Sequence, residues 1–238
     1  MTTSQINADK SVLLNIFNDP FLCISFSQFG EDTLIIENFA TKVFSKRKKF
    51  YVDIGAYHPS RFSNTKVLNM LGWNGINVDA NPDSIELFKN ARPRDINLNL
   101  GISTQGGDLK FYRFSEGAVN TFDKKAADDL INNGWKFIGQ LSIPTLTINE
   151  LLEKYVPPDV LESGIGFLDI DCEGLDAGII EMLDITRFNP LIIAVESHGF
   201  DPLSPMNNQI CKKILPHGYV LAAYLGPTLL FWKQNPDY

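Results

Sequence analysis

Carboxylates recur at every second residue in the stretch GFLDIDCEG, at Asp169, Asp171 and Glu173, directly after an apolar run. Residues spaced by two project from the same side of a β-strand, so we expect these side chains to leave one strand end together. A later apolar run, LIIAVESHG, ends in the polar residues Glu196 and His198. Open α/β sheets place their chemistry at the carboxyl ends of neighbouring strands, so the two groups are expected to share one crevice.

Two kinds of chemistry suit this group. Asp171, Glu173, Glu196 and His198 are candidate catalytic residues, because a carboxylate or an imidazole can take the proton from an acceptor hydroxyl. Alternatively, Asp169, Glu196 and His198 hold Mg²⁺ or Mn²⁺, which lowers the pKa of that hydroxyl. Carboxylates that follow an apolar strand are costly unless they meet a cation, a donor or water. The residue types leave both roles open.

A glycine turn follows an earlier apolar run in the stretch YVDIGAYHP. Gly55 allows the backbone to turn sharply and to approach a ligand, and the amides at the start of the next helix favour an anionic group. Asp79 ends the following apolar run. In a doubly wound sheet, an acidic residue at that position binds the ribose hydroxyls of a nucleoside. The pattern therefore predicts a nucleoside-containing cofactor.

The turn favours S-adenosylmethionine over a dinucleotide. A pyrophosphate needs the three glycines of GxGxxG, whereas Gly55 is followed here by Ala56, Tyr57 and His58. S-adenosylmethionine has no pyrophosphate, and Asp53 is positioned to meet its methionine ammonium directly or through water. A NAD-dependent oxidoreductase on the same fold stays as an alternative, and so does a non-catalytic module that only binds the nucleoside.

Short apolar runs alternate with amphipathic segments along the chain, which predicts the scaffold for these residues. The expected strands are 50–54, 75–78, 96–100, 165–170 and 190–195. The expected helices are 29–44, 64–71, 82–90 and 174–183. This alternation is typical of an α/β protein with a doubly wound, mostly parallel sheet.

The segment at about 104–160 does not fit a single crossover between two parallel strands. Its expected elements are a strand at 108–114 and helices at 122–133 and 146–155, the last with a capping box of Thr147 and Glu150. We interpret the segment as an insertion that forms a substrate lid, although a purely structural cover fits equally well. Two apolar runs in the tail, around Gly226 and Pro227, predict a closing hairpin.

Length and charge limit the organisation and the partners of the chain. With 238 residues, we expect an N-terminal extension over 1–26 and one domain over 27–238. The 21 Lys and Arg residues against 28 Asp and Glu give a net charge of −7, which argues against nucleic-acid binding. The basic run 46–49 is interpreted as the solvated end of a helix. A small-molecule or glycan partner is expected instead.

The cysteines and the hydropathy pattern bear on the cellular setting. Cys23, Cys172 and Cys211 are far apart and form no CxxC pair, so neither a disulfide framework nor a zinc site is indicated, and a cytoplasmic location is expected. The longest apolar runs fall far short of the roughly 20 residues of a membrane span. The sequence leaves the oligomeric state open, homo-oligomers included.

Several motifs together resemble the FkbM-type S-adenosylmethionine-dependent methyltransferases. They occur in the order SQFGED, YVDIGAYHPSRFSNT, GWNGINVDANP, LNLGIS, TLTINELL, FLDIDCEG and IIAVESHG. The resemblance implies a Rossmann-like class I methyltransferase fold and O-methylation of a carbohydrate hydroxyl, on a nucleotide-linked sugar or a glycan precursor. It implies S-adenosylmethionine as the cofactor and S-adenosylhomocysteine as the product.

The resemblance also implies where the cofactor binds. Asp53, Gly55 and Tyr57 would border its methionine part, Asp79 its ribose, and the turn at Gly101 to Ser103 its adenine. The other matched positions are an upstream motif that folds back toward the cofactor and the start of the helix after the turn. These positions are Gln28, Asp32, Ser63, Asn64 and Thr65.

One position departs from the family pattern. Many members carry Lys where this chain has Asp169, in a sequence of the K-I-D-V-E-G type. The exchange reverses the local charge, so a mechanism that uses that lysine is not expected here. It also strengthens the hypothesis of a divalent metal.

Overall fold

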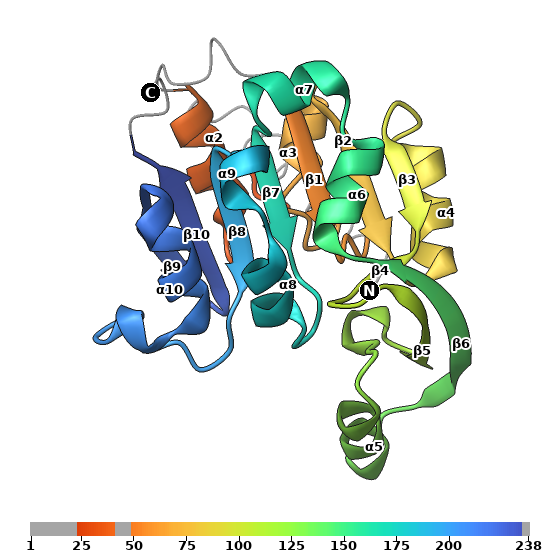
Figure 1. Cartoon of the computed structure of the whole chain (residues 1–238). Coiled ribbons are helices and arrows are strands. Elements are labelled where there is room, and N and C mark those ends of the chain that lie inside the picture. Colours follow the sequence, from red (N-terminus) through yellow and green to blue (C-terminus); the bar gives the residue numbers. More distant parts are fainter. Residues whose placement is uncertain (1–22, 41–48, 235–238) are drawn as a thin grey trace, which may run out of the picture.

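A computed structural model describes residues 23–40 and 49–234. Its centre is a seven-stranded sheet with the order β3-β2-β1-β7-β8-β10-β9, in which β10 runs antiparallel to both of its neighbours (Figure 1). The strands are β1 (Phe50–Ile54), β2 (Asn74–Asp79), β3 (Ile96–Asn99), β7 (Phe167–Ile170), β8 (Ile192–Glu196), β9 (Tyr219–Leu225) and β10 (Thr228–Lys233). The predicted α/β fold with a mostly parallel, doubly wound sheet is confirmed.

Helices cover both faces of the sheet. Strand residues such as Val52 and Ile54 join a large apolar core on one face, whereas Tyr51 joins a second core on the other. The first face carries α6 (Ile148–Tyr155), α7 (Pro158–Ser163), α8 (Asp176–Met182), α9 (Ile185–Phe188) and α10 (Gln209–Ile214). The second carries α2 (Glu31–Ala40) and α3 (Lys66–Met70), while α4 (Pro82–Ala91) packs on β2 and β3. The buried strands are apolar throughout because both of their faces are covered.

A second sheet lies beyond the carboxyl ends of the parallel strands, at the lower right of Figure 1. It has the order β4-β6-β5 and is followed in the picture by α5 at its outer end. Its elements are β4 (Gly101–Ile102), β5 (Gly107–Phe114), the 3₁₀ turn η1 (Gly117–Val119), α5 (Lys124–Asn132) and β6 (Phe137–Leu146). β5 pairs antiparallel with β6, and β4 pairs parallel with it.

The sequence did not predict β6, α7 or α10. Most residues of β6 are exposed or half-buried, so the strand lacks the buried apolar run that identifies a core strand. Pro158 ends the expected helix but occupies the first turn of α7, a position that proline tolerates because no N–H is needed there. The sequence prediction therefore succeeded where burial was strong and failed at exposed or short elements.

The capping box predicted before α6 is confirmed. Thr147 Oγ1 accepts a hydrogen bond from the Glu150 N–H at 3.3 Å, and Glu150 Oε2 accepts one from the Thr147 N–H at 2.8 Å. These bonds satisfy donors that the first helical turn leaves without a partner. They fix the point where the chain returns from the second sheet to the main core.

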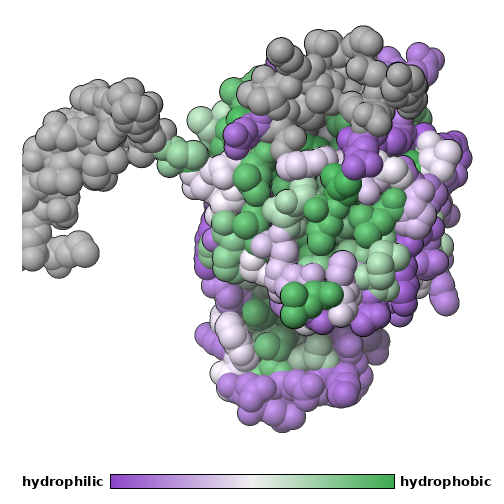
Figure 2. All heavy atoms as spheres, turned by 90° about the vertical axis from the view of Figure 1, so that its left-hand side faces the viewer, coloured by the Kyte–Doolittle hydropathy of each residue, from purple (hydrophilic) through white to green (hydrophobic). Residues whose placement is uncertain are grey.

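Two of the sequence predictions fall largely outside the described residues. These are the N-terminal extension over 1–26, of which only 23–26 are described, and the basic run 46–49, of which only Lys49 is described. Within the described residues, no helix has both the length and the apolar character needed to cross a membrane. Figure 2, which looks at the left-hand side of Figure 1, shows apolar residues gathered in the middle of that face, with hydrophilic ones around and below them.

Candidate functional site

A cavity of about 640 Å³ opens where the parallel strands end. Its walls come from the turn after β1, the end of β2, the loops after β7 and β8, the β9–β10 turn and the second sheet. One side of the cavity is formed by Phe29, in the segment before α2, and by Glu31, the first residue of that helix. The topology therefore gathers segments from most of the chain around one space, at the edge where open α/β sheets bind ligands.

Gly55 is required by the backbone at the base of the cavity. Its φ is +81°, and a Cβ at this position would overlap the carbonyl oxygen of Asp171. The N–H groups of Gly55 and Ala56 both donate to the Val78 carbonyl, at 2.9 and 3.0 Å. Tyr57 follows with a φ of 52°, an unfavourable value for a residue with a side chain. The turn is thus held in a strained form that brings backbone close to the cavity.

Asp79 lines the cavity at the end of β2, beside this turn. Its carboxylate accepts hydrogen bonds from the Tyr57 N–H at 2.8 Å and from the Asn81 N–H at 2.6 Å. Burial raises the pKa of Asp79 to about 6, against the two backbone bonds, which lower it. A carboxylate offers about four lone-pair positions, so acceptor capacity is left for two further donors such as ribose hydroxyls.

An apolar end of the cavity lies next to Asp79. It is lined by Leu100, Gly101 and Ile102 and by the rings of Phe111 and Phe122, whose centroids are 4.9 Å apart. A flat heteroaromatic ring such as adenine suits these surfaces. The sequence did not indicate that these two rings meet, because the alternation around Phe111 gives the face of a strand but not its neighbour.

Six predicted cofactor positions line the cavity directly, and five others do not. Those in the lining are Gln28, Gly55, Tyr57, Asn64, Asp79 and Gly101. Those outside it are the buried residues Asp32, Asp53, Ser63, Thr65 and Ser103. The buried positions form hydrogen bonds within the protein, so they support the lining from behind.

Asp32 and Ser103 each hold a loop in place. The Asp32 carboxylate accepts hydrogen bonds from the Ser25 hydroxyl at 2.6 Å and from the Phe26 N–H at 2.7 Å. Ser103 Oγ lies 2.9 Å from Thr145 Oγ1 and accepts a hydrogen bond from the Gly106 N–H at 3.0 Å. Asp32 thereby fixes the segment that carries Gln28, and Ser103 ties the turn after β4 to β6.

A buried arginine that the sequence did not reveal organises the layer behind the glycine turn. Arg92 is only 1% exposed, and its Nη2 donates to the Pro59 carbonyl at 2.7 Å and to Ser63 Oγ at 2.9 Å. Its Nη1 donates to Thr65 Oγ1 at 2.8 Å, and the Thr65 hydroxyl in turn donates to Asp53. Burial raises the pKa of Asp53, while the Thr65 bond and the charge of Arg92 oppose that rise. Arg92 therefore links the turn to the end of α4.

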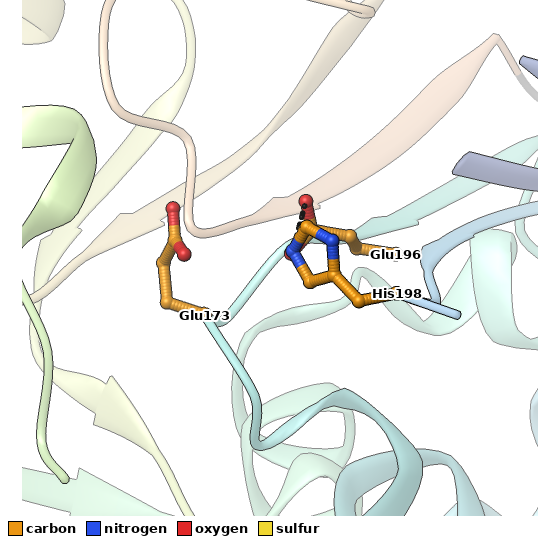
Figure 3. A group of neighbouring side chains, drawn as sticks. All are labelled: Glu173, Glu196 and His198. Atoms are coloured by element: carbon orange, nitrogen blue, oxygen red, sulfur yellow. Dashed lines mark ion pairs between the residues drawn. The ribbon is translucent and has the colours of Figure 1, made fainter. Parts of the chain in front are cut away.

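All four predicted catalytic residues line the cavity. Figure 3 shows Glu196, the last residue of β8, beside His198, with Glu173 on the loop after β7 pointing toward the same space. His198 Nε2 lies 3.2 Å from Glu196 Oε1, and one ligand atom from each of Glu173, Glu196 and His198 lies within 4.8 Å of the others. Asp171 stands at the end of β7, and its carboxyl is close enough to Glu196 for a hydrogen bond when one of them is protonated.

The acidic group has raised pKa values. Burial is the largest cause, and the neighbouring carboxyls add to it. Together they raise the pKa of Glu173 to about 7 and that of Glu196 to about 7. The pKa of Asp171 lies well above its usual value for the same reasons, with Glu196 and Asp176 as its nearest acidic neighbours. Glu196 Oε2 is buried and has no hydrogen-bond partner among the described residues. The group is therefore ready to accept a proton or a cation.

Asp169 does not join this group. It is 6% exposed, it pairs in register with Asp53 on β1, and its Oδ1 accepts a hydrogen bond from Asn64 Nδ2 at 3.3 Å. Burial and the adjacent Asp53 carboxyl hold the pKa of Asp169 well above its usual value. The predicted metal set of Asp169, Glu196 and His198 is thus only partly brought together, and Glu173 completes the cluster instead.

The end of the cavity formed by the segment before α2, the end of β8 and the tail hairpin combines two predicted residues, Glu196 and His198, with residues that were not predicted from the sequence. We call this region the acceptor end and define it by Phe29, Glu31, Glu196, His198, Tyr224 and Thr228, all of which line the cavity. The tail hairpin contributes because β10 pairs with β8, which sets Thr228 opposite Glu196. The sequence predicted the hairpin, but no spacing in the sequence indicated that the hairpin lies beside the carboxylates.

Comparison with known proteins agrees with this architecture. A family model described as the methyltransferase FkbM domain matches residues 53–221. The match begins within β1 and ends within β9, so it contains β2, β3, β7 and β8 as well as the second sheet. A search of curated proteins found no match.

Proposed function

The chain belongs to the FkbM methyltransferase family, and we propose that it transfers a methyl group from S-adenosylmethionine to a hydroxyl of a carbohydrate. The observation that supports this most strongly is that the Gly55 turn, Asp79 and the Glu196–His198 pair line one cavity. Family membership favours methyl transfer over the nicotinamide-dependent alternative. The two acceptor forms expected from the sequence are a nucleotide-linked sugar and a glycan precursor.

The cavity suits the chemical groups of this cofactor. Asp79 offers acceptor positions for the ribose hydroxyls, the surfaces around Phe111 and Phe122 suit adenine, and the Gly55 turn provides close backbone contact for the methionine part. Arg92, Ser63 and Thr65 hold that turn through the hydrogen bonds described above. When bound, S-adenosylmethionine supplies an electrophilic methyl group.

Glu196 and His198 are proposed to receive the proton that the acceptor hydroxyl loses. Glu196 Oε1 is 3.2 Å from His198 Nε2, so the carboxylate orients the imidazole and stabilises it when it is protonated. Asp171 and Glu173 line the cavity beside this pair. Positioning of the hydroxyl and removal of its proton are the two contributions that the chain itself makes.

A divalent metal is the alternative role for the same residues. The cluster of Glu173, Glu196 and His198 supplies two carboxylates and one imidazole at the cavity wall, a donor set that suits Mn²⁺ and, less well, Mg²⁺. Exhaustive chelation followed by addition of Mg²⁺ or Mn²⁺ tests this role. Loss and recovery of methyl transfer supports it, whereas unchanged activity rules it out.

The proposed function is tested in two steps. S-adenosylhomocysteine should raise the melting temperature of the protein, while NADH should not. Incubation with S-adenosylmethionine and a panel of sugars should then give a product heavier by one methyl unit, detected by mass spectrometry. Cofactor binding without transfer to any acceptor would favour the non-catalytic nucleoside-binding module instead.

A further inference from the structure

The ionisable side chains that line the cavity are mostly carboxyls. Its acidic lining residues are Glu31, Asp79, Asp171, Glu173 and Glu196. Among residues 23–40 and 49–234, no lysine or arginine lines it, and His198 is the only histidine that does. A cavity with this lining attracts cations and repels anions, most of all multiply charged ones.

Two arginines near the glycine turn, Arg61 and Arg92, are already engaged. Arg61 forms an ion pair with Glu116 at 3.4 Å and donates to the Tyr57 hydroxyl at 2.8 Å. Arg92 is buried behind the glycine turn, where its Nη2 donates hydrogen bonds to the Pro59 carbonyl and to Ser63 Oγ. Phosphate groups in proteins are usually bound by Arg, Lys or helix amides. Within the described residues, the cavity wall has no Lys or Arg side chain that could bind a diphosphate.

The acidic groups at the acceptor end are firmly built. Glu31 is 2% exposed, its Oε2 accepts a hydrogen bond from the Phe29 N–H at 2.9 Å, and its Oε1 accepts one from Thr228 Oγ1 at 3.2 Å. Thr228 is the register partner of Glu196 across the β8–β10 ladder. The Thr228 hydroxyl thus holds Glu31, and strand pairing sets Thr228 opposite Glu196, so two carboxyls from distant segments line the same cavity. Neither is Asp79, which is proposed to bind the cofactor's ribose.

Aromatic rings accompany these carboxylates. The side chains of Phe29 and Tyr224 line the cavity and are nevertheless 47% and 40% exposed. The Phe29 ring packs against Gly226 in the hairpin turn, and the Tyr224 ring is held edge-on by Phe200 at a centroid distance of 5.0 Å. Rings that are fixed yet open to the cavity, next to carboxylates, form the surroundings in which an ammonium group is bound.

We propose that the acceptor carries a protonated amine and no phosphate, so that it is an amino sugar or an amine-bearing glycoside and not a nucleotide-linked sugar. This inference rests on the proposed function and selects among its acceptors. The ammonium group lies against Glu31 and the aromatic rings. Being protonated, it has no lone pair and does not react. The neighbouring hydroxyl oxygen bonds to the methyl carbon as the carbon–sulfur bond breaks, and its proton passes to the Glu196–His198 pair.

The test compares one sugar in four forms: glucosamine, N-acetylglucosamine, glucose and UDP-glucose, with the galacto and manno series in parallel. Binding to the full chain saturated with S-adenosylhomocysteine is measured by calorimetry, and methyl transfer by mass spectrometry. In at least one series, the amine should bind about tenfold more tightly than the neutral sugar, because charge-assisted hydrogen bonds are the stronger ones. The UDP form should neither bind nor be methylated.

Two variants connect this preference to the acceptor end. Glu31→Gln keeps the size of the side chain and one of its two hydrogen-bond acceptors but removes the charge, so the preference for amine over neutral sugar should largely disappear. Phe29→Leu changes an exposed ring and should reduce the preference without affecting the fold. Glu86→Gln removes the same charge from the exposed face of α4 and is the matched control, with the preference unchanged.

The outcomes separate this inference from the proposed function. Equal binding of amine and neutral sugars, turnover of a UDP-linked sugar, or no binding of any amino sugar by the cofactor-loaded protein overturns the inference alone. Failure to bind S-adenosylhomocysteine overturns the proposed function as well. An unchanged amine preference in Glu31→Gln, with an unchanged melting temperature, contradicts the placement of the ammonium group.

Discussion

The two halves of the cavity differ in how firmly their polar groups are held. On the cofactor side, Asp79 accepts two backbone hydrogen bonds and the buried Arg92 secures the turn behind it. On the catalytic side, the His198 side chain is 71% exposed, and Glu196 has one buried oxygen without a partner among the described residues. The first half is fixed before a ligand arrives, whereas the second keeps unused acceptor capacity.

This difference indicates a division of labour. A rigid binding half reduces the entropy lost when a cofactor binds, because its polar groups are already oriented. A group that must gain a proton during the reaction cannot be fully satisfied by protein donors beforehand, since such bonds would lower its basicity. Substitutions in the two halves should therefore have different signatures: weaker binding and lower stability on one side, slower turnover on the other.

The largest effect is expected on the catalytic side, from Glu196→Gln. Amide replacement keeps the size but removes the proton acceptor, so kcat should fall by about 100-fold or more, in the range typical of general-base loss. The affinity for S-adenosylhomocysteine, measured by calorimetry, should not fall. A variant with normal kcat, or with binding reduced in proportion to kcat, would erase the distinction between the halves.

Arg92→Met should show how much of the cofactor side depends on the buried network. Removing one partner of a buried charged network leaves the others uncompensated, so the free energy of unfolding should fall by about 3 to 5 kcal/mol in urea titrations. Thr65→Val removes one link with little change in shape and should cost about 1 to 3 kcal/mol. Stability equal to that of the wild type in both variants would mean that the network does not hold the turn.

Asp79→Ala tests the cofactor side at the cavity surface. The lost hydrogen bonds to ribose should weaken binding of S-adenosylhomocysteine by about 1 to 3 kcal/mol. At saturating S-adenosylmethionine, kcat should stay near the wild-type value, since the catalytic group is intact. Undiminished affinity in calorimetry would contradict the assignment of Asp79 to the ribose.

The smallest expected effect is a pH dependence of cofactor binding. Burial raises the pKa of Asp79 to about 6, so its carboxyl is protonated below that pH and loses part of its acceptor capacity. Affinity for S-adenosylhomocysteine should fall as the pH drops through about 6 and level off above it. Calorimetry across this range with Asp79→Asn as the control measures the step. If the affinity of Asp79→Asn varied with pH in the same way as that of the wild type, the pH dependence would belong to other carboxyls.

Much of the fold was predictable because burial leaves a strong pattern. Apolar runs such as Phe50–Ile54 are continuous since helices cover both faces of the sheet. The Thr147–Glu150 capping box also depends only on neighbouring residues. The strand β6 was not predicted, because its residues are largely exposed and show no pattern of buried apolar positions.

The candidate site was predictable only in part. The motifs identified the glycine turn, Asp79 and the polar strand ends, but they did not separate residues that line the cavity from those behind it. Asp169 and Asp171 illustrate this limit, because β7 ends at Ile170 and the alternation of sides stops there. Asp169 faces Asp53 within the protein, whereas Asp171 faces the cavity.

The sequence by itself determined the family, the alternation of strands and helices, and the residue types at the strand ends, since each depends on short spacings along the chain. The tertiary structure alone decided that Arg92 lies behind the glycine turn and that Glu31, Thr228 and Glu196 form one wall. Such groupings join segments that are remote in sequence. They depend on how the sheet orders its strands, which no local spacing encodes.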